Sequence, residues 1–207
     1  MTTDWDRSCG FADARSHIAA RHVEERDVMA FVGVSHEELG FVPVEYRSGA
    51  LDAATEAKLH NAVVEAIGNA PAVFLPVGAG GTFSMLQRLL HRLVPPLRPP
   101  GGTTPHHDHL ALTDLLIEPL LADGREVWLY EDLPYLWAGP GDDRARLLTA
   151  THNAVCTEVN VPVDRQHKAA AINRYTSQAP AVVLRPADKV ANALPPTERY
   201  WRLCRQR

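Results

Sequence analysis

Two short apolar runs constrain the fold of this chain more than any other feature, because each lies next to a segment with a helical pattern. Ala72–Val77 leads into the glycine loop Gly78–Gly81 and then into a helical pattern over Phe83–Leu93. Glu126–Tyr130 is the second apolar run, and it follows a predicted helix over Leu110–Leu121. Strands that alternate with helices are typical of a parallel sheet covered by helices. The sequence therefore predicts the α/β class.

The rest of the chain is consistent with a single domain over residues 1–207. This length lies close to that of one domain, and 45% hydrophobic with 22% charged residues is typical of a globular protein. Residues 94–105 are rich in proline and glycine, so we expect a surface loop there. The other predicted elements are helices over Ala12–Val32, Asp52–Ile67, residues 142–155 and residues 164–177, and a last strand over Ala181–Leu184.

Charge and hydropathy exclude several classes of partner. Twenty-one basic residues against twenty-five acidic ones give a net charge of -4, so no basic field attracts nucleic acid or an anionic membrane. The start of the chain lacks the pattern of a cleaved signal peptide. Cys9, Cys156 and Cys204 form no C-x-x-C pair and are typical of thiols in a reducing compartment. We therefore expect a cytoplasmic protein that binds neither nucleic acid nor membrane.

The segment Pro105–His109 concentrates the groups that carry chemistry. Its sequence, P-H-H-D-H, has three imidazoles and a carboxylate in four consecutive positions at a predicted junction between loop and helix. If the helix begins there, His106 and His109 share a face at i and i+3, and both can be aimed at one ion or one substrate. A solvated polar loop in which Asp108 caps the helix is the competing interpretation.

Two other segments fall at the same predicted edge of the sheet. The Gly78–Gly81 loop has backbone N–H groups that could bind an anion at a helix N-terminus, but it lacks the full G-x-G-x-x-G spacing, so a plain tight turn is favoured. Glu131 and Asp132 directly follow an apolar run, where substrate binding and capping of the next turn are both open. Ligands bind beyond the carboxyl ends of strands in such sheets, which places all these groups in one candidate site.

Several motifs resemble those of the PIG-L (LmbE-like) N-deacetylases and occur in the same order along the chain. The resemblance covers nearly the whole chain, and its H-x-D-H and Y-E-D-L-P-Y motifs are fairly specific in combination. The motifs occur at Arg21–Glu25, Val32–Val34, Leu39–Phe41, Pro105–His109, Tyr130–Tyr135, Lys168–Ile172 and Tyr175–Gln178.

The resemblance implies a fold, a reaction and roles for individual residues. The implied fold is a Rossmann-like three-layer sandwich with a mostly parallel sheet, and the implied reaction is zinc-dependent or similar metal-dependent removal of an N-acetyl group from a small amino sugar or glycoside. His109 is implied as a metal ligand, His106 as the group that acts on the carbonyl oxygen or the leaving amine, and Asp108 as a residue that orients an imidazole. Arg21 is similar to an arginine that holds substrate hydroxyls, and Glu131 and Asp132 are further candidates for substrate binding.

The sequence departs from the family pattern at one point, and this departure leaves more than one interpretation of its function. Family members open with a strand that ends in H-P-D-D, which supplies two further metal ligands and a general base, and this sequence contains no such motif. We expect that the first strand and its motif lie upstream of these residues, and that zinc binding without them is weak, because a catalytic zinc ion takes three protein ligands. Two rivals remain: a catalytically inactive sugar-binding or interaction protein of the same fold, and a nucleotide-binding α/β enzyme that uses Gly78–Gly81. Self-association into a homo-oligomer is left open.

Overall fold

The computed structural model describes residues 2–47, 49, 51–80, 106–137, 139–179 and 187–205. The chain divides into two compact units, which are described separately. The first unit comprises residues 1–66 and 162–197, and the second comprises residues 67–161 and 198–207. Because this division by itself does not decide how many domains the chain forms, the single domain over residues 1–207 stays a prediction. Residues 94–105 lie outside the described residues.

The first unit is built from helices. The longest, α2, begins after Asp13, whose side chain accepts a hydrogen bond from the N–H of Ser16, and it ends at Gly33, which adopts the left-handed conformation. This confirms the helix predicted over Ala12–Val32. The helices in the described part of the unit are α1 (Asp4–Ser8), α2 (Ala14–Val32), the short 3-10 helix η1 (Val44–Tyr46), α3 (Ala53–Ile67, whose last residue belongs to the second unit), α7 (Arg165–Ile172), η4 (Ala187–Lys189) and α9 (Val190–Ala193).

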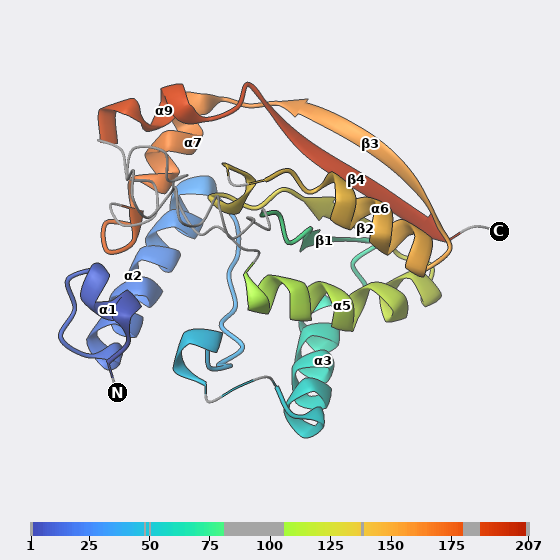
Figure 1. Cartoon of the computed structure of the whole chain (residues 1–207), viewed down its shortest axis with the longest axis horizontal. Coiled ribbons are helices and arrows are strands. Elements are labelled where there is room, and N and C mark those ends of the chain that lie inside the picture. Colours follow the sequence, from blue (N-terminus) through green and yellow to red (C-terminus); the bar gives the residue numbers. More distant parts are fainter. Residues whose placement is uncertain are drawn as a thin grey trace, which may run out of the picture. The chain divides into compact units, whose positions relative to one another are not determined.

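The second unit contains a four-stranded sheet in the order β1-β2-β4-β3 (Figure 1). The strands β1 and β2 are parallel, with Ala72 opposite Glu126 and Pro76 opposite Tyr130, whereas β2 and β4 are antiparallel. The elements in the described part of this unit are β1 (Ala72–Pro76), α5 (His107–Ala122), β2 (Glu126–Tyr130), η3 (Tyr135–Trp137), α6 (Asp142–Thr151), β3 (Ala154–Pro162, whose last residue belongs to the first unit) and β4 (Thr197–Arg205, whose first residue does).

One face of this sheet forms the core of the unit. Val127 and Leu129 on β2 are fully buried, as is Leu203 on β4, and α5 contacts both β1 and β2. The helices α5 and α6 are joined by the Arg144–Asp114 ion pair and by the His152–Glu118 pair, so both helices cover this face. The opposite face carries an aromatic cluster in which Phe74, 55% exposed, stacks on Trp128 at 5.6 Å. The third layer of the expected sandwich therefore stays a prediction.

The structure corrects the expectation of a mostly parallel sheet. The sheet is mixed, and β1 and β2 are the only parallel pair among its described strands, because β4 enters between β2 and β3 in the antiparallel direction. The helix predicted over residues 142–155 ends at Thr151, and the chain then forms β3. The predicted strand over Ala181–Leu184 lies outside the described residues. Of the helices in the described ranges, none is both long enough and apolar enough to cross a membrane.

Candidate functional site

The candidate site lies in the second unit, where the parallel strands β1 and β2 end and α5 begins. Gly78–Gly80 follow β1, Glu131 and Asp132 follow β2, and α5 starts at His107. The helix starts there because His106 is its N-cap, whose ring Nδ1 accepts a hydrogen bond from the N–H of Asp108 at 3.3 Å. Parallel strands bring their carboxyl ends to one edge of the sheet, so the histidine cluster and the acidic pair meet as predicted.

The central contact of the site joins His109 to Asp132. The Nδ1 of His109 lies 2.5 Å from Oδ2 of Asp132, and the N–H of Ala79 donates to Oδ1 of Asp132 at 3.0 Å. Asp132 is only 4% exposed, whereas the His109 side chain is 32% exposed. An ionised carboxylate only accepts hydrogen bonds, so Nδ1 of His109 carries a proton and the neutral ring keeps its lone pair on Nε2. This is the arrangement in which an imidazole ligates a metal ion.

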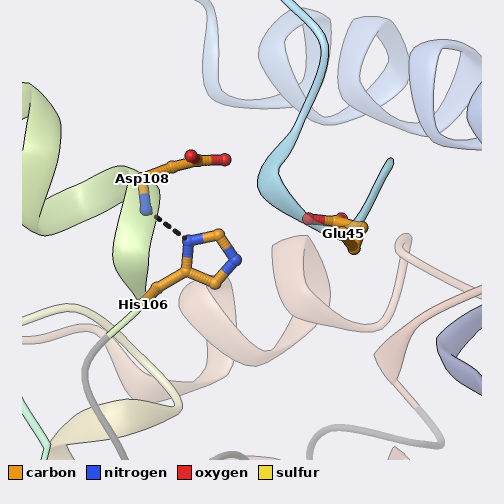
Figure 2. Close-up of side chains that lie close together, drawn as sticks. All are labelled: Glu45, His106 and Asp108. Carbon is orange, nitrogen blue, oxygen red and sulfur yellow. Dashed lines mark hydrogen bonds between the residues drawn. The ribbon is translucent and has the colours of Figure 1, made fainter. Parts of the chain in front are cut away.

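His106 has the opposite arrangement of its ring nitrogens. Because Nδ1 of His106 accepts the backbone hydrogen bond from Asp108, shown in Figure 2, the neutral ring carries its proton on Nε2 and can donate it. The centroids of the His106 and His109 rings are 4.9 Å apart. One unit thus brings a proton-donating imidazole next to an imidazole suited to ligation.

Asp108 lies next to His106, but its carboxylate is not the group that contacts His109. The hydrogen bond in Figure 2 starts from the backbone nitrogen of Asp108. His106 and Asp108 each offer a metal-ligand atom, and these atoms lie within 4.8 Å of each other. The predicted role of Asp108, orientation of an imidazole, stays a prediction. Glu45, which is also labelled in Figure 2, belongs to the first unit.

Tyr135 completes the surroundings of the two imidazoles. It follows the cis peptide bond between Leu133 and Pro134, and its ring lies edge-on to His109 with the centroids 5.5 Å apart. The ring of His106 lies 5.8 Å from that of Tyr135. The sequence patterns assigned Tyr135 no role in the site. Its place in Y-E-D-L-P-Y, three positions after Asp132, is the signal that could have located it.

Glu131 and Asp132 are neighbours in sequence but have different partners. The Oε1 of Glu131 accepts a hydrogen bond from the N–H of Gly141 at 2.9 Å and another from Arg199 at 2.5 Å. The substrate-binding role of both carboxylates stays a prediction, and in this structure both bind groups of the protein. The place of Arg199 could not be predicted from the sequence, because its contribution depends on the pairing of β4 beside β2.

The glycine loop forms a tight turn in its described part. Gly78 has φ +74°, and a Cβ placed there would lie 2.5 Å from Cδ2 of Leu110. The N–H of Ala79 donates to Asp132, and the N–H of Gly80 donates to the carbonyl of Gly139 at 3.1 Å. These two amides already have partners in the protein, which favours the tight turn over the anion-binding interpretation.

Electrostatics at the end of β2 follow from burial. Burial and, to a smaller extent, the nearby carboxylate of Asp132 raise the pKa of Tyr130, the last residue of β2, to about 12. The Tyr130 hydroxyl therefore stays protonated at physiological pH and has no role as a base.

Arg21 lies in the first unit, which also holds most of the segments on which the family resemblance depends. The guanidinium of Arg21 pairs with the carboxylate of Glu45 at 2.9 Å, and its predicted role in holding substrate hydroxyls stays a prediction. Glu24, on the same helix, accepts hydrogen bonds from the hydroxyl of Thr176 at 2.9 Å and from the hydroxyl of Ser177 at 2.6 Å. The Arg21–Glu25 and Tyr175–Gln178 segments therefore meet within this unit.

Comparison with known proteins supports the fold assignment. No protein-family model matches the sequence, and a search of curated proteins gives no match. A crystal structure of a deacetylase–bog complex from the teicoplanin biosynthesis pathway matches with a TM-score of 0.59 and 18% sequence identity, over 98% of this chain and 79% of that chain. This chain has a deacetylase-like fold. The α/β expectation is thereby confirmed, whereas the activity, the substrate and the zinc ion stay predictions.

Proposed function

We propose that this protein is a metal-dependent hydrolase that removes an N-acetyl or other N-acyl group from an amino sugar or glycoside. The observation that carries the proposal is the hydrogen bond of 2.5 Å between Nδ1 of His109 and Asp132. Its position at the ends of β1 and β2, in a fold similar to that of a deacetylase, supports the same conclusion. A zinc ion is the proposed cofactor, and a small N-acylated sugar is the proposed substrate.

In this proposal the two imidazoles have different roles in amide hydrolysis. Water adds to the acyl carbon, the C–N bond breaks, and the amine leaves with a proton. Asp132 orients His109 so that its Nε2 lone pair is available to the ion. His106 carries its proton on Nε2 and donates it to the departing amine. When bound, the metal ion supplies Lewis acidity, which polarises the acyl carbonyl and activates water.

The donor set of the second unit fits part of a zinc site. At the ends of β1 and β2, His109 is held at Nδ1 by a carboxylate, and His106 and Asp108 offer ligand atoms beside it. A catalytic zinc ion takes three protein ligands, and the tautomer of His106 is that of a proton donor. We therefore expect weak zinc binding that depends on His109. Turnover should appear only when the zinc concentration is high enough to occupy a low-affinity site.

The test measures zinc affinity and acetate release together. Titration with zinc and assay against a panel of N-acetylated amino sugars and glycosides would be carried out on the full chain, on His109→Ala and on His106→Ala. We expect His109→Ala to weaken zinc binding and turnover together. We expect His106→Ala to keep the zinc affinity but lose about 10²- to 10⁴-fold in kcat, as for a removed general acid.

A matched control is available on the same unit. His152, the C-cap of α6, also pairs with a carboxylate at 2.9 Å, but with that of Glu118 in the last turns of α5, not at the start of that helix. His152→Ala should leave zinc affinity and turnover unchanged. If His109→Ala has no more effect than His152→Ala, the proposed site is wrong.

A sugar-binding protein without catalytic activity is the second candidate. The observation that favours it is that His109 alone combines an imidazole with an orienting carboxylate in the described part of the site. This candidate predicts binding of the N-acylated sugar without release of acetate at any zinc concentration, with an affinity that does not depend on zinc. Calorimetry with and without zinc separates the two candidates.

A further inference from the structure

The loop between β2 and α6 carries two of the residues that contact the ring of His109. Asp132 binds its Nδ1 at 2.5 Å, and the ring of Tyr135 lies edge-on to it, with centroids 5.5 Å apart. The loop begins at Glu131 and ends at Gly141, the N-cap of α6. The orientation of His109 therefore depends on what fixes the two ends of this loop.

Arg199, on β4, contacts both ends. Its Nη2 lies 2.5 Å from Oε1 of Glu131 at the start of the loop. At the other end, Nη1 and Nη2 bind the two oxygens of Asp142 at 2.9 and 2.8 Å. Glu131 also accepts the N–H of Gly141 at 2.9 Å, so the two ends contact each other directly as well.

The chemistry of this contact favours a rigid arrangement. A guanidinium is planar and binds a carboxylate with two parallel hydrogen bonds, which fixes direction as well as distance. Glu131 is only 8% exposed, so solvent screens the ion pair little. The guanidinium also lies 4.8 Å from the ring centroid of Trp201, which is buried in the sheet. The hydrogen bond to Glu131, followed by those to Asp142, raises the pKa of Arg199 against the opposing effect of burial.

We propose that Arg199 is a positioning residue, which holds both ends of the 131–141 loop and thereby sets the orientation of His109 through Asp132. Its consequence for turnover rests on the proposed hydrolase function, but its effect on the His109 ring does not. In this proposal, Glu131 is part of the support for the site and not a group that touches substrate.

The test compares two arginines of the same strand. Arg199→Met removes the contacts with both ends of the loop, and Arg199→Lys keeps the charge but loses the planar two-pronged geometry. Arg202→Met is the control, because Arg202 also lies on β4 and pairs with β2, but at Glu126, the first residue of that strand. The readout is the ¹⁵N signals of the His109 ring, which report which nitrogen carries the proton, together with the thermal unfolding midpoint.

We expect Arg199→Met to reduce the population of His109 rings protonated on Nδ1, with Arg199→Lys intermediate and Arg202→Met unchanged. Where turnover is measurable, we expect kcat to fall about 10- to 100-fold for Arg199→Met, as when a group that orients a ligand is lost. If Arg199→Met does not fold, the comparison of Arg199→Lys with Arg202→Met gives the same test.

The proposal is wrong if both Arg199 variants keep the wild-type signals of His109, or if Arg202→Met changes these signals as much as they do. The ring signals are measured without substrate or zinc. Absence of turnover in the wild type would therefore contradict the proposed function and leave the positioning role to be decided by the ring signals alone.

Discussion

Replacement of Asp132 by Asn should reverse the tautomer of His109. The Asn side chain has one acceptor and one donor end, and its oxygen is needed by the N–H of Ala79, which donates to Asp132 at 3.0 Å. The amide NH₂ then faces Nδ1 of His109 and donates to it, which leaves the ring proton on Nε2. The lone pair available to a metal ion on Nε2 is lost.

The size of this effect follows from the burial of the site. The flipped amide would place its NH₂ against the N–H of Ala79, two buried donors facing each other beside a residue that is 4% exposed. Leaving a buried donor without an acceptor costs about 1–3 kcal/mol, which corresponds to a preference of roughly 5- to 150-fold for the unflipped amide. Zinc affinity should fall about 10- to 100-fold, as for other residues that orient a ligand.

Long-range ¹H–¹⁵N correlation spectra of the histidine rings measure this directly at about pH 8, where an ordinary imidazole is neutral. Glu118→Gln is the control, because Glu118 contacts His152 in the same way but is half exposed to water. A His109 ring that stays protonated on Nδ1 in Asp132→Asn would refute the reasoning.

Two further predictions concern backbone conformation and pH. Gly78→Ala should lower the free energy of unfolding, measured in urea, by at least about 1–2 kcal/mol, because φ is +74° there and the new Cβ would meet Leu110. Adding Leu110→Ala to this variant should remove the contact with the Leu110 side chain but not the backbone strain. Unchanged stability of Gly78→Ala would contradict the strain. For Asp6, burial favours the neutral form, but hydrogen bonds from Tyr46, Thr3 and His17 outweigh it and hold the pKa of the carboxyl well below its ordinary value. The ionised Asp6 carboxylate stabilises the folded state fully above about pH 4, and this stabilisation is lost as pH falls further. Asp6→Asn should therefore flatten the dependence of the unfolding midpoint on acid pH. An equally steep dependence in the variant would count against this.

The sequence predicted the elements whose signals are local. The apolar run Ala72–Val77 became β1, and the apolar stripe over Asp52–Ile67 became α3, with Gly68 at φ +53° after its end. The strands β3 and β4 were missed, although Trp201 and Leu203 alternate with polar residues at the spacing of a half-buried strand. The order of the sheet could not be predicted, since β4 joins β2 from a distant part of the chain.

The candidate site was predicted in the same uneven way. The spacing of His106 and His109 and the place of Glu131 and Asp132 after a strand brought the right groups to one edge of the sheet. The sequence could not tell which carboxylate faces His109, because adjacent residues point in different directions. The direction of each carboxylate is set by a contact with a residue far away in the chain. Asp132 accepts a hydrogen bond from Ala79, and Glu131 accepts one from Arg199.

The place of β4 in the sheet has a consequence for synthesis of the chain on the ribosome. In the sheet β4 lies between β2 and β3, yet it is translated after both, and residues 163–196 of the first unit are made in between. Until β4 emerges, one edge of β2 and the backbone of β3 lack the neighbour that they have among the described strands of the sheet. Unpaired edges of this kind recruit strands from other chains. Slow translation of the last segment, or crowding of nascent chains on one messenger RNA, would thus favour aggregation over folding.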